Sequence, residues 1–202
     1  MQLWYASTSP FARKVRIAAH ELDLDRRIAL VETNPWTNTH LRKLNPLAKV
    51  PTLVLDDGEI FFESAVICDY LDSLGPSRRL IAETGAARWR ALRLQGLADG
   101  AATAAGRLYA DEHRPRDERS EAMMDRLRQA LGAALDAGEI DPPLQGDCAI
   151  GAIAMAALLG YLDFRWPERD WRSARPKLAA WFAAFSTRPS MIATEHRPAR
   201  IS

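Results

Sequence analysis

The chain of 202 residues carries 27 basic and 26 acidic side chains, and its net charge of +1 gives no sign of a nucleic-acid or anionic-membrane binder. Its 48% hydrophobic content is ample for a packed core, and its length suggests one large domain or two small ones. The two cysteines, Cys68 and Cys148, fall in separate apolar helical patterns, which argues against a structural disulfide and fits a reducing compartment.

The first predicted strand, residues 2–6, runs into a helix whose start carries hydroxyl side chains. Ser9 is the predicted N-cap, and Pro10 takes the first helical position, where its missing N–H costs nothing. Three basic residues follow in the next two turns: Arg13, Lys14 and Arg16. Helix starts attract anions, so the hydroxyls of Thr8 and Ser9 could face a bound thiolate and lower its pKa. Alternatively, Ser-Pro is an ordinary capping pair, and the basic residues form a solvated helix face with a local anion field.

A proline-containing segment leads into the next strand. Pro51 has no N–H to give to a sheet, so we expect it at an edge or in a turn. A cis bond between Val50 and Pro51 would turn the Val50 backbone outward, where an extended ligand could pair with it like an added strand.

A second helix start follows a predicted hairpin. An Asp-Asp-Gly-Glu turn joins two apolar runs, residues 52–55 and 60–62, which is a strong hairpin signal. Glu63 ends the second strand, and Ser64 is the predicted cap of a helix over residues 65–74. Ser64 could bind a carboxylate and Glu63 an ammonium group, the two charges of an α-amino acid. The alternative is a plain helix cap with a solvated Glu63.

Taken together and in this order, the motifs resemble the cytosolic glutathione transferases, above all small bacterial proteins of the Ser-Pro-Phe type. The matching motifs are Ser-Pro-Phe-x-Arg-Lys at 9–14, Asn-Pro-x-x-Lys-Val-Pro-x-Leu at 45–53, and Glu-Ser at 63–64. The resemblance implies an α/β thioredoxin-like N-terminal domain, residues 1–76, which binds glutathione. It further implies an all-α C-terminal domain, residues 84–202, which contributes the electrophile pocket.

The resemblance also implies which hydroxyl faces the glutathione sulfur. Ser9, directly before the helix-opening proline, is the first choice, and Thr8 is the alternative. Neither position is a cysteine, so mixed-disulfide chemistry is not expected. Tyr5 lies inside the first strand, too early in the chain for activation by a tyrosine.

The remaining glutathione contacts follow from the same resemblance. Val50 pairs through its backbone with the cysteinyl part, beside a cis Pro51. Glu63 and Ser64 hold the γ-glutamyl ammonium and carboxylate. Lys49 lies near the glycyl carboxylate, or is a solvated surface lysine.

The second half is predicted to be helical, beyond a break near residues 73–77. The predicted helices are residues 84–109, 118–137, 148–161 and 175–186, followed by a short final turn after Pro189 and a polar, frayed tail over 196–200. The longest apolar run, 148–162, is shorter than the roughly 20 residues that span a bilayer. Relatives carry a Ser/Thr-x-x-Asp cap at the start of this buried helix; Ala149 and Ala152 stand there in this chain, and Asp147 could replace the cap.

Several positions are candidates for the electrophile pocket or for a subunit contact. Residues 89–114 would line the pocket, and the small side chains at 101–106 leave room for a ligand or allow close helix packing. Trp36 walls the glutathione site or covers the core. Asp99 could face a neighbouring subunit's site.

The resulting expectation is a cytoplasmic, homodimeric glutathione transferase for detoxification, without a metal, a nucleic-acid partner or a membrane. The glutathione thiolate would attack a small hydrophobic electrophile or a peroxide. The main alternative is a non-catalytic protein of the same fold that binds glutathione or a conjugate. A glutathione-dependent isomerase or dehalogenase is a second enzymatic alternative.

Overall fold

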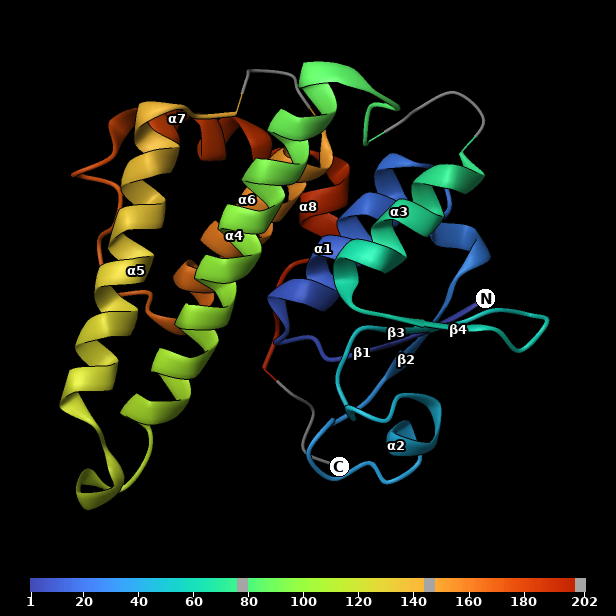
Figure 1. Cartoon of the computed structure of the whole chain (residues 1–202), viewed down its shortest axis with the longest axis horizontal. Coiled ribbons are helices and arrows are strands. Elements are labelled where there is room, and N and C mark those ends of the chain that lie inside the picture. Colours follow the sequence, from blue (N-terminus) through green and yellow to red (C-terminus); the bar gives the residue numbers. More distant parts are fainter. Residues whose placement is uncertain (76–79, 144–147, 199–202) are drawn as a thin grey trace.

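The computed structural model describes residues 1–75, 80–143 and 148–198, which form a four-stranded sheet with its helices and a second half made of helices (Figure 1). The first half contains β1 (Gln2–Tyr5), α1 (Pro10–Glu21), the 3-10 turn η1 (Asp25–Arg27), β2 (Ala29–Glu32), α2 (Leu41–Leu44), β3 (Thr52–Val54), β4 (Ile60–Phe62) and α3 (Ser64–Leu74). The second half contains α4 (Gly85–Glu112), η2 (Arg116–Glu118), α5 (Glu121–Ile140), α6 (Ile150–Arg165), α7 (Pro176–Phe185) and α8 (Pro189–Ala193). This order confirms the expected thioredoxin-like α/β fold followed by helices.

The register of the sheet brings separate chain segments to one edge. The strand order is β2-β1-β3-β4, with β2 parallel to β1 and the other two pairs antiparallel. Trp4 near the end of β1 lies opposite Thr52 at the start of β3, and Thr52 lies opposite Phe62 at the end of β4. The chain therefore leaves β1 and β4, and enters β3, at the same edge. Because β3 pairs on both sides, Pro51 stands in the turn that precedes an internal strand.

The core of the first half lies between the sheet and two helices. In Figure 1, α1 and α3 cover one face of the sheet, and α2 lies on the opposite side. The fully buried side chains come from the sheet and from both helices: Leu3, Leu53, Val15, Ile17, Ile67 and Leu71. The apolar side of α1 predicted from its helical spacing is therefore confirmed as a core face.

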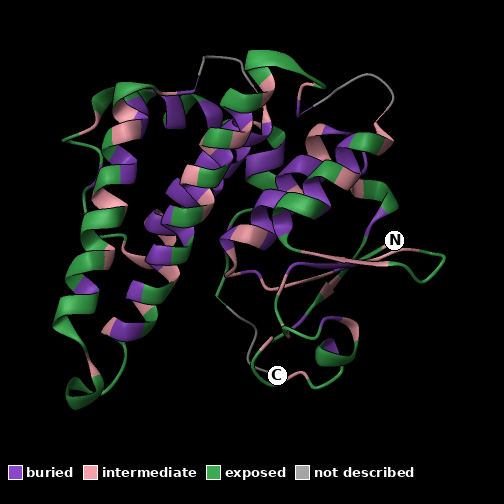
Figure 2. Cartoon of the chain, in the orientation of Figure 1, coloured by how far each residue is buried: buried purple, intermediate pink, exposed green. Residues whose placement is uncertain are grey.

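Helix α6 forms the centre of the second half. All its residues from Ile150 to Leu162 are buried, and α6 packs against α4 on one side and α1 on the other (Figure 2). A Cβ added to Gly151 would lie 2.7 Å from the Ala91 carbonyl oxygen, so only glycine permits this approach of α4. Four of the small residues in α4 are buried, which favours the helix-packing explanation for most of that stretch: Ala101, Ala102, Ala104 and Ala105. None of the helices among the described residues is both long and apolar enough to cross a membrane.

Two predicted helix caps differ from the structure. Helix α3 begins at Ser64 itself, so Glu63 occupies the N-cap position, and no side chain caps the helix. Ser64 is therefore the first helical residue and not the cap. Helix α6 begins after Ala149, again with no side-chain cap bond, and the proposed substitute Asp147 lies outside the described residues.

Helix boundaries in the second half also shift. Helix α5 begins at Glu121, where the Ser120 side chain accepts a hydrogen bond from the backbone N–H of Met123, and it continues to Ile140, beyond the predicted end at residue 137. The break expected after α3 is present at Gly75, but Pro76 and Ser77 lie outside the described residues.

Candidate functional site

The start of α1 presents a capping hydroxyl whose own proton is not used in the cap. Ser9 Oγ accepts the backbone N–H of Ala12 at 3.2 Å, which confirms Ser9 as the N-cap, and Pro10 follows it in the first turn. The backbone N–H of Ser9 donates to the carbonyl of Ala6 at 3.0 Å and fixes the turn. A hydroxyl that accepts the cap bond through a lone pair can still donate its proton to a ligand. Thr8 and Ser9 are both half-buried and stand beside each other before the helix.

The segment before β3 is held in shape by buried polar bonds. The Val50–Pro51 bond is cis, as expected. Asn45 is buried, and its Nδ2 donates to the Lys49 carbonyl at 3.1 Å and to Thr52 Oγ at 3.0 Å. Thr52 Oγ donates to the same carbonyl at 2.8 Å. Asn45 thus organises this turn, a role that its place in the Asn-Pro motif did not reveal. Lys49 is exposed.

The start of α3 presents backbone N–H groups beside a residue in an unusual conformation. Glu63 is exposed and has a φ of +67°, which a residue with a Cβ seldom adopts. Ser64 is buried, with 4% of its surface exposed. The first hydrogen bond of the helix runs from the N–H of Ile67 to the Glu63 carbonyl at 3.0 Å. The backbone N–H groups of residues 64–66 therefore have no acceptor within the helix. The N–H groups at a helix start favour bound anions.

These three segments meet at the edge set by the Trp4–Thr52–Phe62 register. We call this edge, with residues 6–9, 50–51 and 63–64, the site edge. Both α1 and α3 begin there, on the left of the sheet in Figure 1. Their positive dipole ends therefore point to the same region of space.

Two further residues are predicted for the electrophile pocket or a subunit contact, Trp36 and Asp99. Trp36 follows β2 and is 93% exposed, so it does not cover the core. Asp99 lies in α4, and its carboxylate forms an ion pair with Lys14 of the same chain, with 2.6 Å between Nζ and Oδ2.

The basic residues of α1 are not a solvated face, and this corrects the expectation for two of them. Lys14 is 1% exposed and is paired with Asp99. Arg13 is more than nine-tenths buried and donates to the Met191 carbonyl at 3.2 Å. Burial lowers the pKa of Arg13 to about 10, which leaves it charged at neutral pH. Both side chains attach α1 to the helical half. Arg16 is partly exposed and donates to the Ala193 carbonyl.

The beginning of the C-terminal tail is packed beside the site edge and is not frayed. His196 is buried, and its Nδ1 donates to the Ser7 carbonyl at 3.0 Å. Burial, reinforced by the charge of Arg13, lowers the pKa of His196 to about 3. The ring is therefore neutral, with its proton on Nδ1. Arg197 and Pro198 beyond it are exposed.

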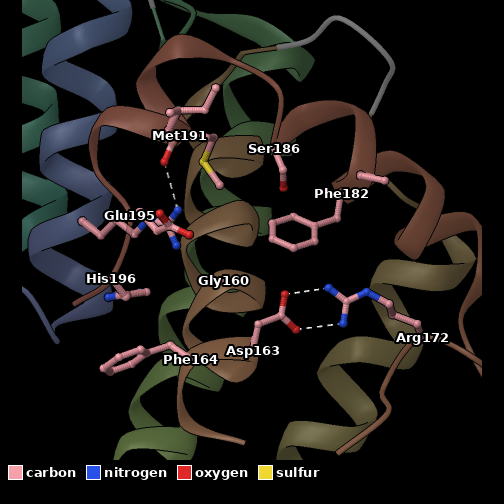
Figure 3. A pocket seen from close by; sticks show the side chains of 12 residues that line it. Gly160, Asp163, Phe164, Arg172, Phe182, Ser186, Met191, Glu195 and His196 are labelled. Carbon is pink, nitrogen blue, oxygen red and sulfur yellow. Dashed lines mark hydrogen bonds and ion pairs between the residues drawn. The ribbon is translucent and has the colours of Figure 1, made fainter. Parts of the chain in front are cut away.

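A cavity of about 520 Å³ lies between α1, α6, α7 and α8 (Figure 3). Arg13 and His196 line this cavity. The ion pair between Asp163 and Arg172, with 2.6 Å between Oδ2 and Nη2, lies along one side of it. None of the residues predicted to bind glutathione lines this cavity. The cavity is thus separate from the site edge.

Cys68 does not have the surroundings of a nucleophile. Cys68 is fully buried, and burial raises the pKa of its thiol to about 12. Cys148 is half-buried, and both cysteines are free of disulfides. Within the described residues no group of three or more His, Cys, Asp or Glu side chains could hold a metal ion.

Comparisons with known proteins agree with this geometry. Residues 8–74 match the glutathione S-transferase N-terminal domain, and residues 110–184 match the glutathione S-transferase C-terminal domain. The uncharacterized GST-like protein YibF of Escherichia coli K12 is 30% identical over 200 residues, 96% of this chain and 98% of that protein.

Solved structures of a glutathione transferase family member from Pseudomonas fluorescens Pf-5 are also similar to this chain. The structure with bound glutathione is 36% identical with a TM-score of 0.90, and covers 98% of this chain and 99% of that one. The structure with bound S-(propanoic acid)-glutathione is 38% identical with a TM-score of 0.89, at the same coverage.

Proposed function

The chain belongs to the glutathione S-transferase family, and on that premise we propose that it binds glutathione at the site edge and stabilises its thiolate for attack on an electrophile. The electrophile is a small hydrophobic molecule or a peroxide. The observation that carries the proposal is the convergence of two helix starts and the Val50–Pro51 turn at one edge of the sheet. A relative of 36% identity binds glutathione in its crystal structure, which supports the same ligand here.

Each part of glutathione has a chemically suitable partner at this edge. The cysteinyl backbone pairs with the backbone of Val50. The γ-glutamyl carboxylate meets Ser64 and the N–H groups at the start of α3, and its ammonium meets the exposed Glu63. Lys49 is exposed and free to approach the glycyl carboxylate.

The sulfur lies at the start of α1 in this proposal. Ser9 donates its hydroxyl proton to the sulfur while its oxygen keeps the cap bond to Ala12. A hydrogen bond and a helix dipole both favour the thiolate over the thiol, so the pKa of the bound thiol falls below its ordinary value of about 8.5. Holding the thiolate and the electrophile together then accelerates the attack.

The proposal includes the division of the chain and its assembly. Residues 1–76 form the glutathione-binding domain, and residues 84–202 form the helical domain that contributes the electrophile pocket. The protein acts as a homodimer in the cytoplasm, and sedimentation of the purified chain checks its oligomeric state directly.

Ultraviolet titration of bound glutathione tests the role of the hydroxyl. We expect wild-type protein to shift the thiolate absorbance to lower pH, Ser9→Ala to lose much of that shift, and Thr8→Ala to retain it. The reverse order would assign the role to Thr8. An unchanged shift in both variants would exclude a hydroxyl role.

A non-catalytic binding protein is the second candidate, and one observation favours it. The Ser9 hydroxyl already serves the helix as its cap, so its presence has a structural explanation without catalysis. Calorimetry with glutathione, together with turnover of a panel of electrophiles, separates the two functions. Binding without turnover supports this candidate, and no binding at millimolar glutathione contradicts both.

A further inference from the structure

Helix α6 ends at Arg165, which has no carboxylate partner among the described residues. The guanidinium carbon of Arg165 lies 4.2 Å from the ring centre of Tyr109, 5.3 Å from that of Tyr161 and 4.9 Å from that of Phe164. Among residues 1–75, 80–143 and 148–198 it forms no ion pair, and its Nε is buried without a hydrogen-bond partner. Burial raises the pKa of Tyr161, so this neighbour stays neutral and does not compensate the charge.

Neighbouring arginines on the same side of the molecule are compensated. Arg169 also lies on an aromatic ring, but Glu112 stands 3.0 Å from its guanidinium. Arg172 is paired with Asp163 at 2.6 Å. The chain thus provides carboxylates for these two and leaves Arg165 with neutral aromatic neighbours.

Aromatic faces orient a guanidinium without using its in-plane N–H donors. Arg165 is half-buried, so part of it is accessible to a ligand. One side-chain hydrogen bond joins Arg165 to Tyr161, and a guanidinium carries five N–H donors, so donors remain for a ligand. An oriented, partly desolvated guanidinium with such donors binds a carboxylate well, since the two groups match in geometry and charge. The three rings already restrict the Arg165 side chain, so a ligand that binds it causes little further loss of side-chain conformational entropy.

Side-chain contacts connect Arg165 to the start of α1. The ring of His196 stacks on Phe164 at 5.3 Å and meets the edge of Tyr161 at 5.8 Å, and its Nδ1 donates to the Ser7 carbonyl. Ser7 lies two residues before Ser9. Within the part of the chain that the structure describes, Ser7 Oγ, His196 Nε2 and Arg165 Nε are buried without hydrogen-bond partners, so this contact chain holds three unsatisfied polar atoms. Such atoms are expected where a polar ligand or water completes the bonding.

We propose that Arg165 binds a carboxylate on the electrophile, so that the preferred substrates are small electrophiles that carry a carboxylate. This deepens the proposed function and rests on it. With a chloronitrobenzoate, the glutathione sulfur forms a C–S bond at the carbon that bears chlorine, the C–Cl bond breaks, and chloride leaves with its electron pair. The thiol proton goes to solvent. Arg165 touches only the carboxylate and acts as a specificity residue.

Binding of two matched conjugates tests the inference without requiring turnover. The probes are the glutathione conjugates formed from 4-chloro-3-nitrobenzoate and from 4-chloro-3-nitrobenzamide, which differ only in one group, a charged carboxylate in the first and a neutral amide in the second. Calorimetry on the full chain should show the carboxylate conjugate binding about tenfold more tightly than the amide, a difference of about 1.4 kcal/mol. Arg165→Met should remove this preference and leave glutathione affinity within about twofold, because the lost interaction involves the conjugate alone.

Two further variants and a change of salt concentration test whether the preference for the carboxylate conjugate depends on the Arg165 guanidinium. Arg169→Met, which removes a compensated arginine from the same side, should retain the preference. Arg165→Lys keeps the charge but not the planar fork, so it should retain part of it. In wild-type protein, 0.5 M KCl should weaken the carboxylate conjugate more than the amide.

The outcomes distinguish a failure of the Arg165 inference from a failure of the proposed function. Equal affinity for the two conjugates in wild-type protein, or an unchanged preference in Arg165→Met, overturns the inference while glutathione binding stands. Failure of wild-type protein to bind glutathione overturns the proposed function, and the inference with it. If Arg165→Met does not fold, the salt dependence and Arg165→Lys decide.

Discussion

Asp99→Asn should be among the most damaging single changes at the junction between α1 and α4. Lys14 is 1% exposed, and the carboxylate oxygens of Asp99 lie 2.8 and 2.6 Å from its Nζ. Asparagine keeps the shape of the side chain but leaves the ammonium of Lys14 buried without a counter-charge. Removing one partner of a buried pair costs about 3–5 kcal/mol. Because the Asp99 side chain is 26% exposed, water reaches that side, and we expect a loss near the lower end, about 3 kcal/mol.

A substitution of Lys14 should lower the free energy of unfolding less than Asp99→Asn does, because Lys14 is the more deeply buried partner of the pair. Lys14→Met leaves a carboxylate that water can reach and puts an apolar side chain where Lys14 was, so the expected loss is about 1 kcal/mol. The double variant should resemble Lys14→Met alone, because the asparagine amide then faces no buried charge. The coupling between the two changes is then about 3 kcal/mol in magnitude, which double-mutant cycles resolve.

Urea unfolding followed by tryptophan fluorescence and by circular dichroism measures these free energies. Asp141→Asn is the matched control, since its carboxylate meets the exposed Arg93 at 3.1 Å and should change the free energy of unfolding by less than about 1 kcal/mol. If Asp99→Asn costs no more than this control, or if the two substitutions of the pair are additive, the assigned role of the ion pair is wrong.

Other predictions concern packing, pH and thiol reactivity. Gly151→Ala would place Cβ 2.7 Å from the Ala91 carbonyl and should cost about 1–3 kcal/mol by urea unfolding, whereas Gly96→Ala, with open space around it, should stabilise α4 by about 0.5–1 kcal/mol. His196 has a folded-state pKa of about 3 against an ordinary 6.5, so only the unfolded chain takes up this proton between those values. Stability should therefore fall as pH drops from 6.5 toward 3, with this residue contributing a slope of up to about 1.4 kcal/mol per pH unit, and His196→Gln should flatten the curve. Cys68 should not react with a disulfide reagent at pH 8 until the protein unfolds; rapid labelling of the native protein, read by mass spectrometry, would contradict its burial.

Local sequence signals determined most elements of the first half. Ser9 and Pro10 define the start of α1 because capping and a fixed φ act within one helical turn. The hairpin between β3 and β4 follows from its Asp-Gly turn between two apolar runs. The apolar spacing of α6 likewise determined a buried helix.

The order of the three motifs indicated which residues to consider for the site, but not how they meet. That meeting depends on the Trp4–Thr52–Phe62 register, which joins segments far apart in the chain. Asn45 illustrates the limit, since a buried amide that bonds Lys49 and Thr52 looks like any other turn asparagine in the sequence.

Only the tertiary structure decided how the charged residues are used. Arg13 and Lys14 look like a solvated helix face because basic side chains on a surface helix usually are one. Their burial depends on Asp99 and Met191, which lie about 85 and 178 positions further along the chain. The same holds for Arg165, whose aromatic surroundings come from two different helices. Capping, turns and periodicity act over a few residues and can be read from the sequence, whereas charge pairing depends on which distant segments the fold brings into contact.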